Sequence, residues 1–434
     1  MKKRNLFLTS VFIAGVTIVL VSCQQSHDNN EVEDTGDDAG AWEVEGIWDG
    51  AIKVPDAPIH IVVSFQEGEE LSGSISIPTQ GVDDYPLTIG ENEEDKELVF
   101  TMDIAGETLS FKGDPEDDKI AGTFTQSGQE FPFELTKQDE ASNETEDGAF
   151  LSIDTEDGKL YGELETPDGD GPFPVMIIIP GSGPTDRNGN TAMGDNNGLK
   201  MVAESLAEHG IASLRYDKRG AGKNKDAVTD EEEDMRFDQF IADAEAWVNE
   251  LDADKRFSRI GIFGHSQGSL VGMEAARDGA VDVYVSVAGA GSPYDELILE
   301  QLKTQLPDNL LAESEDILQH LREGETVEDV PQALQILMSW MQYNPREDIQ
   351  ALDKPTLIVN GTRDLQVTES EADKLHEAKS DAEMLIVDDM NHVLKKAPAD
   401  RGGNLETYWD SDLPLADGLM EGIFDFLDET GFRK

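Results

Sequence analysis

The stretch Ile260-Gly-Ile-Phe-Gly-His-Ser-Gln-Gly268 joins a short apolar run to a serine flanked by two glycines. The apolar run predicts a buried strand, and the segment Ser269 to Arg277 predicts a helix directly after the turn. A turn this sharp strains the backbone, so a side chain at either glycine would collide with neighbouring main chain. The turn would lift the Ser266 hydroxyl above the sheet, at the positive end of a helix. The pattern therefore predicts that Ser266 is a nucleophile.

Strand and helix signals alternate on both sides of this turn. The predicted strands lie at 175–180, 211–215, 260–263, 281–287, 356–359 and 383–387, and the predicted helices at 199–209, 237–251, 269–277, 369–378 and 415–427. Continuous apolar runs such as 175–180 are typical of parallel strands buried on both faces. The alternation predicts an α/β domain with a mostly parallel sheet over residues 149–434. Residues 293–349 show helical spacing only, and we expect them to form a lid over the strand ends.

An earlier part of the chain, residues 42–137, has a different pattern. Its apolar runs are short and β-rich, with Gly, Asp and Pro turns between them, and lie at 59–65, 71–77, 98–104, 108–111, 120–125 and 131–135. This spacing is typical of a sandwich or barrel, so we expect a small all-β domain. It loosely resembles the β-domain that precedes the catalytic domain in some bacterial hydrolases. The acidic, polar residues 138–148 predict a linker.

The N-terminus has the features of an export signal. Three basic residues at positions 2–4 precede an apolar stretch, Leu6 to Val21, which is shorter than the roughly 20 residues of a membrane span. Its end, Leu20-Val-Ser-Cys23, resembles the lipobox of bacterial lipoproteins, in which the signal is cleaved before an acylated cysteine. We therefore expect a signal peptide over 1–22, a lipid on Cys23, an acidic tether over 23–41, and anchoring at the extracytoplasmic face of the membrane.

The charge balance bears on partners and environment. The chain has 92 acidic and 33 basic residues, a formal net charge of −59. Such a field repels nucleic acid and anionic lipid headgroups, so we expect no nucleic-acid partner. An excess spread over the whole chain is typical of a halophilic protein, although an exported protein with acidic linkers is an alternative. Neither metal-ligand spacing nor a Gly-rich phosphate motif occurs, so the sequence predicts no metal or cofactor.

A nucleophilic serine needs a base, because its alkoxide is not available at neutral pH. In hydrolases with this turn, the acid and then the histidine follow the serine along the chain. Of the three histidines after Ser266, His320 lies in the predicted lid and His376 lies within an amphipathic helix. His392 lies in the loop after the strand 383–387, where an imidazole could reach over the end of the sheet. We therefore expect His392 to be the base.

The base in turn needs a carboxylate that holds its tautomer. Asp364 follows the apolar strand 356–359 and is the expected acid. Asp388 and Asp389 are closer to His392 in sequence and remain alternatives, although they share its loop, where a surface role is expected.

Two backbone N–H groups should stabilise the oxyanion of the tetrahedral intermediate. One is expected to be that of Gln267, the residue after the nucleophile. The second should come from the glycine-rich loop Ile179 to Asn190, after an earlier buried strand. Within that loop Ser182 is the first candidate and Gly183 the next.

Five segments together resemble the bacterial α/β-hydrolase esterases that carry a PGSGPTDRDGN-type loop, an RYDKRG turn and a GHSxG turn. They are PGSGPTDRNGN at 180–190, RYDKRG at 215–220, GHSQG at 264–268, NGTRD at 360–364 and NHVLK at 391–395. The resemblance covers about residues 150–430. It implies the α/β-hydrolase fold and carboxylesterase activity on a small-molecule ester with a short acyl chain, with Ser266, Asp364 and His392 as the triad. Asn188 departs from the family, where an acidic residue is common.

Within the RYDKRG segment, we hypothesise that Asp217, Lys218 and Arg219 form a structural turn that pins the loop carrying the oxyanion donor. Two other functions remain open from sequence. The same triad could serve a serine peptidase that acts on short peptides through the lid. Alternatively, the chain could be a surface-binding lipoprotein that uses residues 42–137 and keeps the hydrolase domain only as a scaffold.

The charge excess generates a prediction about salt. Like charges repel over about 30 Å at 0.01 M salt but only about 3 Å at 1 M, so the folded state should gain stability as salt is added. We expect the midpoint of thermal unfolding to be higher in molar NaCl or KCl than at low salt. Equal midpoints at both salt concentrations would contradict the halophilic interpretation.

Overall fold

The computed structural model of the protein describes residues 44–433 except positions 56–57, 67, 69–70, 78–81, 92–96, 105–106, 117, 139–148, 156, 192–193, 229–234, 278, 304–307 and 324–334. The expected signal peptide, Cys23, the tether and most of the expected linker lie outside the described residues. The described residues fall into two compact units, divided between residues 144 and 145. Among the described residues, no helix is both long and apolar enough to cross a membrane.

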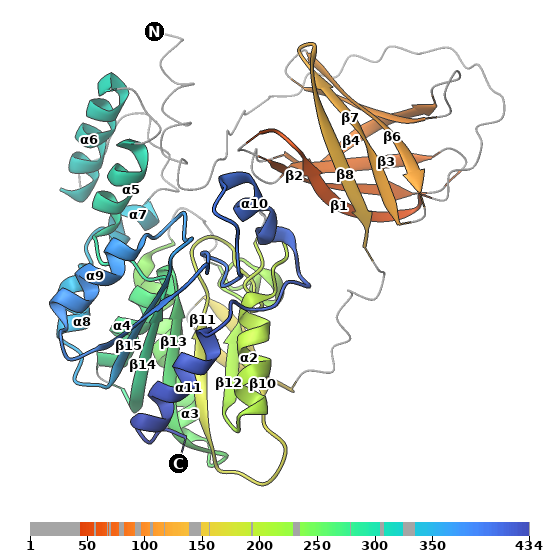
Figure 1. The fold of residues 1–434 in the computed structure, drawn as a ribbon. Helices are drawn as coiled ribbons and strands as arrows, with labels where there is room; N and C mark the ends of the chain where they lie inside the picture. Colours follow the sequence, from red (N-terminus) through yellow and green to blue (C-terminus); the bar gives the residue numbers. More distant parts are fainter. Residues whose placement is uncertain are drawn as a thin grey trace. The chain divides into compact units, whose positions relative to one another are not determined.

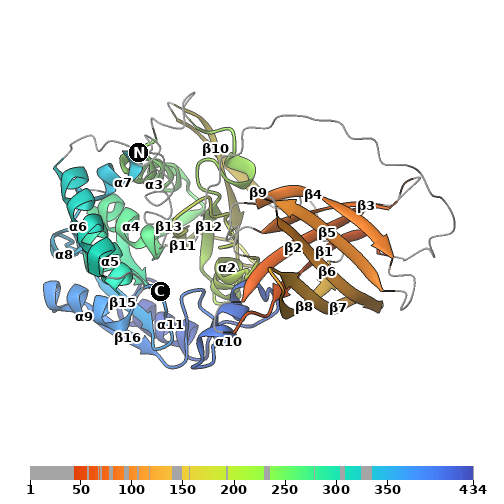
Figure 2. The same cartoon turned by 90° about the horizontal axis from the view of Figure 1, so that it is seen from above.

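The first unit is a closed barrel of eight antiparallel strands in sequential order, in which β1 also pairs with β8 (Figure 1). The strands are β1 (Gly46–Ile52), β2 (Ile59–Gln66), β3 (Ser72–Ile77), β4 (Val82–Glu91), β5 (Leu98–Ile104), β6 (Glu107–Glu116), β7 (Lys119–Gln126) and β8 (Gln129–Lys137). All six predicted runs are strands, which confirms the expected all-β domain, and β1 and β4 are additions to the prediction. Figure 2 shows the same strands (red to orange) from above.

Aromatic side chains fill the interior of this barrel. The ring of Phe100 stacks on Phe111 at a centroid distance of 4.7 Å and meets Phe65 and Phe133 edge to face at 5.6 and 5.9 Å. Trp48 is also buried, and its indole N–H donates to the carbonyl oxygen of Val44 at 2.7 Å. Alternate residues of each strand supply this core, as the two-residue period of a strand requires.

The second unit is built on an eight-stranded sheet with the order β9-β10-β12-β11-β13-β14-β15-β16. Its strands are β9 (Ala149–Thr155), β10 (Gly158–Glu165), β11 (Phe173–Ile179), β12 (Ala212–Tyr216), β13 (Phe257–His265), β14 (Val281–Val287), β15 (Thr356–Gly361) and β16 (Glu383–Val387). The pairs β9–β10 and β10–β12 are antiparallel, and the other five neighbouring pairs are parallel. The expected mostly parallel sheet is confirmed, and β9 and β10 are additions to the prediction.

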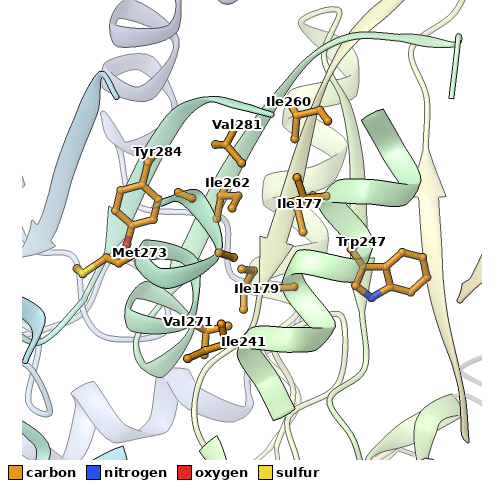
Figure 3. Packing of buried hydrophobic residues seen from close by; sticks show 14 of the residues in the cluster. Ile177, Ile179, Ile241, Trp247, Ile260, Ile262, Val271, Met273, Val281 and Tyr284 are labelled. Carbon is orange, nitrogen blue, oxygen red and sulfur yellow. The ribbon is translucent and has the colours of Figure 1, made fainter. Parts of the chain in front are cut away.

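Helices cover both faces of this sheet because the parallel strands are apolar on both sides. In β11, Val175, Ile177 and Ile179 pack towards one face, whereas Met176 and Ile178 pack towards the other. The first face is covered by α3 (Phe237–Ala253), α4 (Gln267–Arg277), α8 (Pro345–Gln350) and α9 (Glu369–Ala378); the second by α2 (Gly198–Glu208) and α11 (Leu419–Glu429). Figure 3 shows the first of these layers, where strand side chains meet those of α3 and α4, including Trp247 and Val271.

The segment between β14 and β15 is helical, as predicted. It contains α5 (Tyr294–Lys303), α6 (Asp308–Arg322) and α7 (Gln335–Trp340) ahead of α8, and its helices share a small apolar core around Leu302 and Leu321. In Figure 1 these helices gather in one group. The carboxylate of Glu371 in α9 accepts N–H bonds from Gly291 and Ser292 at 2.9 and 2.7 Å, which fastens the chain entering this segment. A short helix, α10 (Arg401–Glu406), lies between β16 and α11.

Candidate active site

Ser266 occupies a strained turn between β13 and α4. Its φ of 55° lies in the left-handed region, which residues with a side chain seldom adopt. A Cβ on Gly264 would lie 2.4 Å from the carbonyl oxygen of Gly268, and one on Gly268 would lie 2.3 Å from that of Ile179. Both glycines are therefore required, as the sequence pattern predicts. The N–H of Ser266 donates to the carbonyl oxygen of Val287 at 2.9 Å, which ties the turn to the end of β14.

The structure brings Ser266, His392 and Asp364 together. His392 Nε2 lies 3.1 Å from Ser266 Oγ, and His392 Nδ1 lies 2.8 Å from Asp364 Oδ2. Both His392 and Asp364 are buried. The other carboxylate oxygen of Asp364 accepts the N–H groups of Gln366 and Val367 at 2.8 and 2.9 Å, so the carboxylate is held from both sides.

This geometry selects one tautomer of His392. The carboxylate of Asp364 is an acceptor, so Nδ1 carries the proton and donates it, and the lone pair of Nε2 faces the serine hydroxyl. An imidazole in this state can take the Ser266 proton. The arrangement can therefore perform nucleophilic catalysis at a carbonyl carbon.

The other acids and histidines considered from sequence lie elsewhere. Asp388 is exposed, and Asp389 pairs with Arg363 at 3.3 Å, so neither provides the carboxylate that holds His392. His320 is on α6, where Nδ1 bonds the carbonyl oxygen of Asp316 at 2.6 Å, and His376 is on α9.

His265 is a residue of the site that sequence reasoning missed. Its Nε2 bonds the carbonyl oxygen of His392 at 2.8 Å, which fixes the backbone of the loop that carries His392. Burial lowers the pKa of His265 to about 4, so the ring is a neutral N–H donor near pH 7. The sequence feature that could have drawn attention to it is the histidine directly before Ser266 in the Gly264-His-Ser-Gln-Gly268 turn. His265 is therefore a support for His392.

A second support for the His392 loop is the buried side chain of Asn391. Its Nδ2 donates to Thr407 Oγ1 at 2.6 Å and Asn404 Oδ1 at 3.2 Å, and its Oδ1 accepts the N–H of Lys395 at 3.1 Å. Each polar atom of this amide is thus satisfied, as a buried polar group requires. The network holds the turn after β16 in one conformation.

Of the two expected oxyanion donors, Gln267 follows Ser266 in the chain, and Ser182 follows a glycine that lies beside Ser266. Gln267 is the first residue of α4, and the N–H groups in the first turn of a helix have no acceptor within the helix. Ser182 follows Gly181, where an added Cβ would lie 3.3 Å from Ser266 Cβ. Its carbonyl oxygen accepts the Thr185 hydroxyl at 2.7 Å, and Gly183 has a φ of 76°, so the loop turns sharply here.

Charged side chains hold the glycine-rich loop after β11 in place. The carboxylate of Asp217 accepts the N–H of Arg187 at 2.7 Å and its guanidinium at 3.0 Å, and Arg187 also pairs with Glu163 at 2.6 Å. Asp186 accepts the N–H groups of Asn188 and Asn190 at 2.9 and 2.8 Å, and burial raises the pKa of Asp186 to about 6. The contact between Asp217 and the loop agrees with the pinning role hypothesised for this turn.

Among the described residues, no group of three or more His, Cys, Asp or Glu side chains is arranged to hold a metal ion.

Comparisons with known proteins found several that are similar to this chain. A family model described as serine aminopeptidase, S33, matches residues 196–306. Esterase EstD of Thermotoga maritima is 28% identical over 335 residues, which cover 75% of this chain and 75% of EstD. The structure of esterase Pf2001 from Pyrococcus furiosus gives a TM-score of 0.44 at 20% identity, covering 65% of this chain and 90% of that one. Est1E from Butyrivibrio proteoclasticus gives 0.42 at 19% identity, covering 65% and 98%.

The architecture and the site agree on the fold. A mostly parallel eight-stranded sheet carries helices on both faces, a helical insertion after β14 and a Gly-His-Ser-Gln-Gly turn at the end of β13. The chain has the α/β-hydrolase fold, preceded in sequence by an all-β domain, as the sequence predicts.

The contact between His392 and Asp364 generates a prediction. In Asp364→Asn, the amide NH₂ faces Nδ1 and favours the tautomer with the proton on Nε2, so the base is lost. We expect hydrolytic kcat to fall about 10³- to 10⁴-fold with a small change in the midpoint of thermal unfolding. The matched control is Asp388→Asn at an exposed acid, which should keep full activity. Loss of activity in Asp388→Asn with retention in Asp364→Asn would reverse the assignment.

Proposed function

We propose that the chain is a carboxylesterase-type serine hydrolase that cleaves small carboxylic esters with short acyl chains. The observation that carries the proposal is the hydrogen-bonded chain from Asp364 through His392 to Ser266, with distances of 2.8 and 3.1 Å. The enzyme class is further supported by the sequence relationship to an esterase over 75% of the chain. The short acyl chain rests on the resemblance of the five motif segments and is the finer part of the proposal.

In the first half of the reaction, Ser266 Oγ attacks the ester carbonyl carbon while its proton passes to His392 Nε2. The carbonyl π electrons move to oxygen and create a tetrahedral oxyanion. When this intermediate collapses, the bond to the alkoxy oxygen breaks, and that oxygen takes the proton from His392 as it leaves. The products of this half are a free alcohol and an acyl ester of Ser266. Asp364 stabilises the imidazolium that exists between the two proton transfers.

In the second half, water takes the place of the alcohol. His392 Nε2 removes one proton as the water oxygen attacks the acyl carbon, and a second tetrahedral oxyanion forms. Its collapse breaks the bond to Ser266 Oγ, which recovers the proton from His392, and the carboxylic acid leaves. Each oxyanion is stabilised by the N–H groups of Ser182 and Gln267. These donors are effective because they are already oriented before the negative charge develops.

The cellular setting is also part of the proposal. We infer that the chain is exported and anchored through a lipid on Cys23 to the extracytoplasmic face of the membrane, in a salty environment. The support is in the sequence: a basic start, an apolar stretch, the Leu-Val-Ser-Cys end of that stretch and the net charge of −59. Residues 24–41 would then separate the folded units from the membrane surface as a flexible tether.

A second candidate function is hydrolysis of short peptides. It is favoured by the match of residues 196–306 to a family model described as serine aminopeptidase. The same two steps would apply, except that the leaving group is an amine, which must take its proton from His392 before the C–N bond breaks. Ester cleavage depends less on protonation of the leaving group, because an alkoxide leaves more readily than an amide anion.

The substrate class can be measured directly. We expect the form lacking residues 1–23, in molar salt, to hydrolyse p-nitrophenyl acetate and butyrate faster than the octanoate, and faster than aminoacyl p-nitroanilides. Ser266→Ala should lower kcat by about 10⁴-fold or more. The matched control is Ser258→Ala, an exposed serine at the opposite end of the same strand, β13, which should retain full activity.

Two outcomes would change the assignment. Faster cleavage of the p-nitroanilides would select the peptidase function. No hydrolysis of either substrate class by a folded protein would contradict the catalytic proposal as a whole.

A further inference from the structure

Lys218 is a buried lysine whose side chain contacts two residues beside Ser266. It belongs to the turn after β12 and is only 5% exposed. Its Nζ donates to the carbonyl oxygen of Gly181 at 3.0 Å and to Oε1 of Gln267. The ring of Phe240 in α3 covers the same ammonium, with its centroid 4.2 Å from Nζ. The side chain thus links the loop after β11 to the first residue of α4.

Both acceptors belong to the groups that carry the oxyanion donors. The carbonyl of Gly181 and the N–H of Ser182 are two ends of one peptide group, and a peptide group is planar with the two bonds in opposite directions. A hydrogen bond that fixes the Gly181 oxygen therefore fixes the direction of the Ser182 N–H. The side chain of Gln267 is held by the same ammonium, and its backbone supplies the other donor.

The main chain of Lys218 reinforces this link, because its N–H donates to the carbonyl oxygen of Thr185, in the same loop, at 3.1 Å. The charge also acts on the peptide electronically. A cation on the Gly181 oxygen draws electron density from the amide, which makes the Ser182 N–H a stronger donor. Lys218 is enclosed by Gly181, Gln267 and Phe240, so it acts through the peptide and not on the substrate.

Fold stability alone does not require a charge at this position. Burial lowers the pKa of Lys218 to about 7, although the nearby carboxylate of Asp243, which pairs with Arg219 at 2.6 Å, favours the charged form. Replacing a buried charge with an apolar side chain of similar volume is often neutral or stabilising. The unbranched thioether of Met would fill the same space beside Phe240.

We propose that Lys218 is a positioning residue that presets both backbone donors of the oxyanion hole through its bonds to Gly181 and Gln267. The inference rests on the proposed function, since an oxyanion hole has a role only if Ser266 attacks a carbonyl carbon. It goes beyond the pinning of the loop by Asp217, because it gives the neighbouring lysine a specific effect on the transition state.

The test compares the purified wild-type protein with Lys218→Met and Lys218→Gln. The first readout is the split between kcat and KM on p-nitrophenyl butyrate. The second is the affinity for an alkyl trifluoromethyl ketone. Ser266 Oγ adds to the carbonyl carbon of this ketone, the serine proton passes to His392, and the ketone oxygen becomes an oxyanion. The corresponding methyl ketone, which stays mostly planar, reports binding without the oxyanion.

We expect each variant to lower kcat about 10- to 100-fold. This loss is at most similar to the loss of about 10²- to 10³-fold that follows removal of one oxyanion donor. The affinity for the trifluoromethyl ketone should fall by a similar factor, whereas KM and the affinity for the methyl ketone should stay within about twofold of the wild type. A merely structural role would lower the thermal midpoint or the fraction of titratable sites, and would leave kcat per titrated site unchanged.

The matched control is Lys379→Met. Lys379 is also buried, and its Nζ donates to the main-chain carbonyl of Leu352 at 3.0 Å, near the amino ends of β15 and β16. This variant loses that bond and the ion pair between Lys379 Nζ and Asp381 at 3.1 Å, at the end of the sheet opposite to Ser266. Any effect should therefore be on stability, and kcat should stay unchanged. If Lys218→Met does not fold, Lys218→Gln, which keeps a neutral donor, decides the question.

The outcomes separate this inference from the proposed function. Unchanged kcat and ketone affinity in a folded Lys218 variant would overturn the positioning role, while an active wild type would leave the esterase proposal standing. A wild type that turns over no ester but binds the trifluoromethyl ketone at Ser266 would still report on Lys218 through the binding readout. A folded wild type that does neither would overturn both.

Discussion

The strained turn at Ser266 is the constraint on which the rest of the site depends. A φ of 55° at a serine is stable here because two glycines allow backbone contacts that no other residue would permit, and because the Ser266 N–H is bonded to the end of β14. The turn directs the hydroxyl away from the sheet and begins α4 at the next residue. One backbone conformation therefore positions the Ser266 hydroxyl, the Gln267 N–H and the helix terminus together.

The parallel sheet supplies the remaining groups. The carboxyl ends of parallel strands lie at one edge of a sheet, so the loops after β11, β12, β13, β15 and β16 converge although they are far apart in sequence. Ser182, Lys218, Ser266, Asp364 and His392 each come from one of these loops. The supporting bonds are mostly to backbone groups, as in the bond from His265 to the His392 carbonyl, and these leave the reacting side chains free to move protons.

Residue type and order were enough to predict which three side chains the structure joins, Ser266, Asp364 and His392, because each follows a recognisable buried strand. From sequence, Lys218 was expected only as part of a turn that pins the loop after β11. The bonds of His265 and Lys218 to the carbonyl oxygens of His392 and Gly181 could not be predicted, because the fold sets the positions of those carbonyls. Among the strands, β4 contains two aspartates and a proline. The hairpin β9–β10 ends the sheet, and charged or hydroxyl side chains interrupt the apolar residues of both strands, so their apolar signal is weak. The last helix begins at Leu419 and not at Leu415, because Gly418, with a φ of 85°, precedes its first turn.

Covalent labelling of the nucleophile tests the central claim most directly. A fluorophosphonate loses fluoride when an activated serine oxygen attacks phosphorus, and the stable ester that remains can be located by tandem mass spectrometry. Trypsin releases Ser266 in the peptide Ile260–Arg277, which also contains Ser269 as an internal comparison. The account predicts one label per chain, on Ser266, that is absent in His392→Gln. A label on Ser269 or on any other residue, or no label on the folded protein, would contradict it.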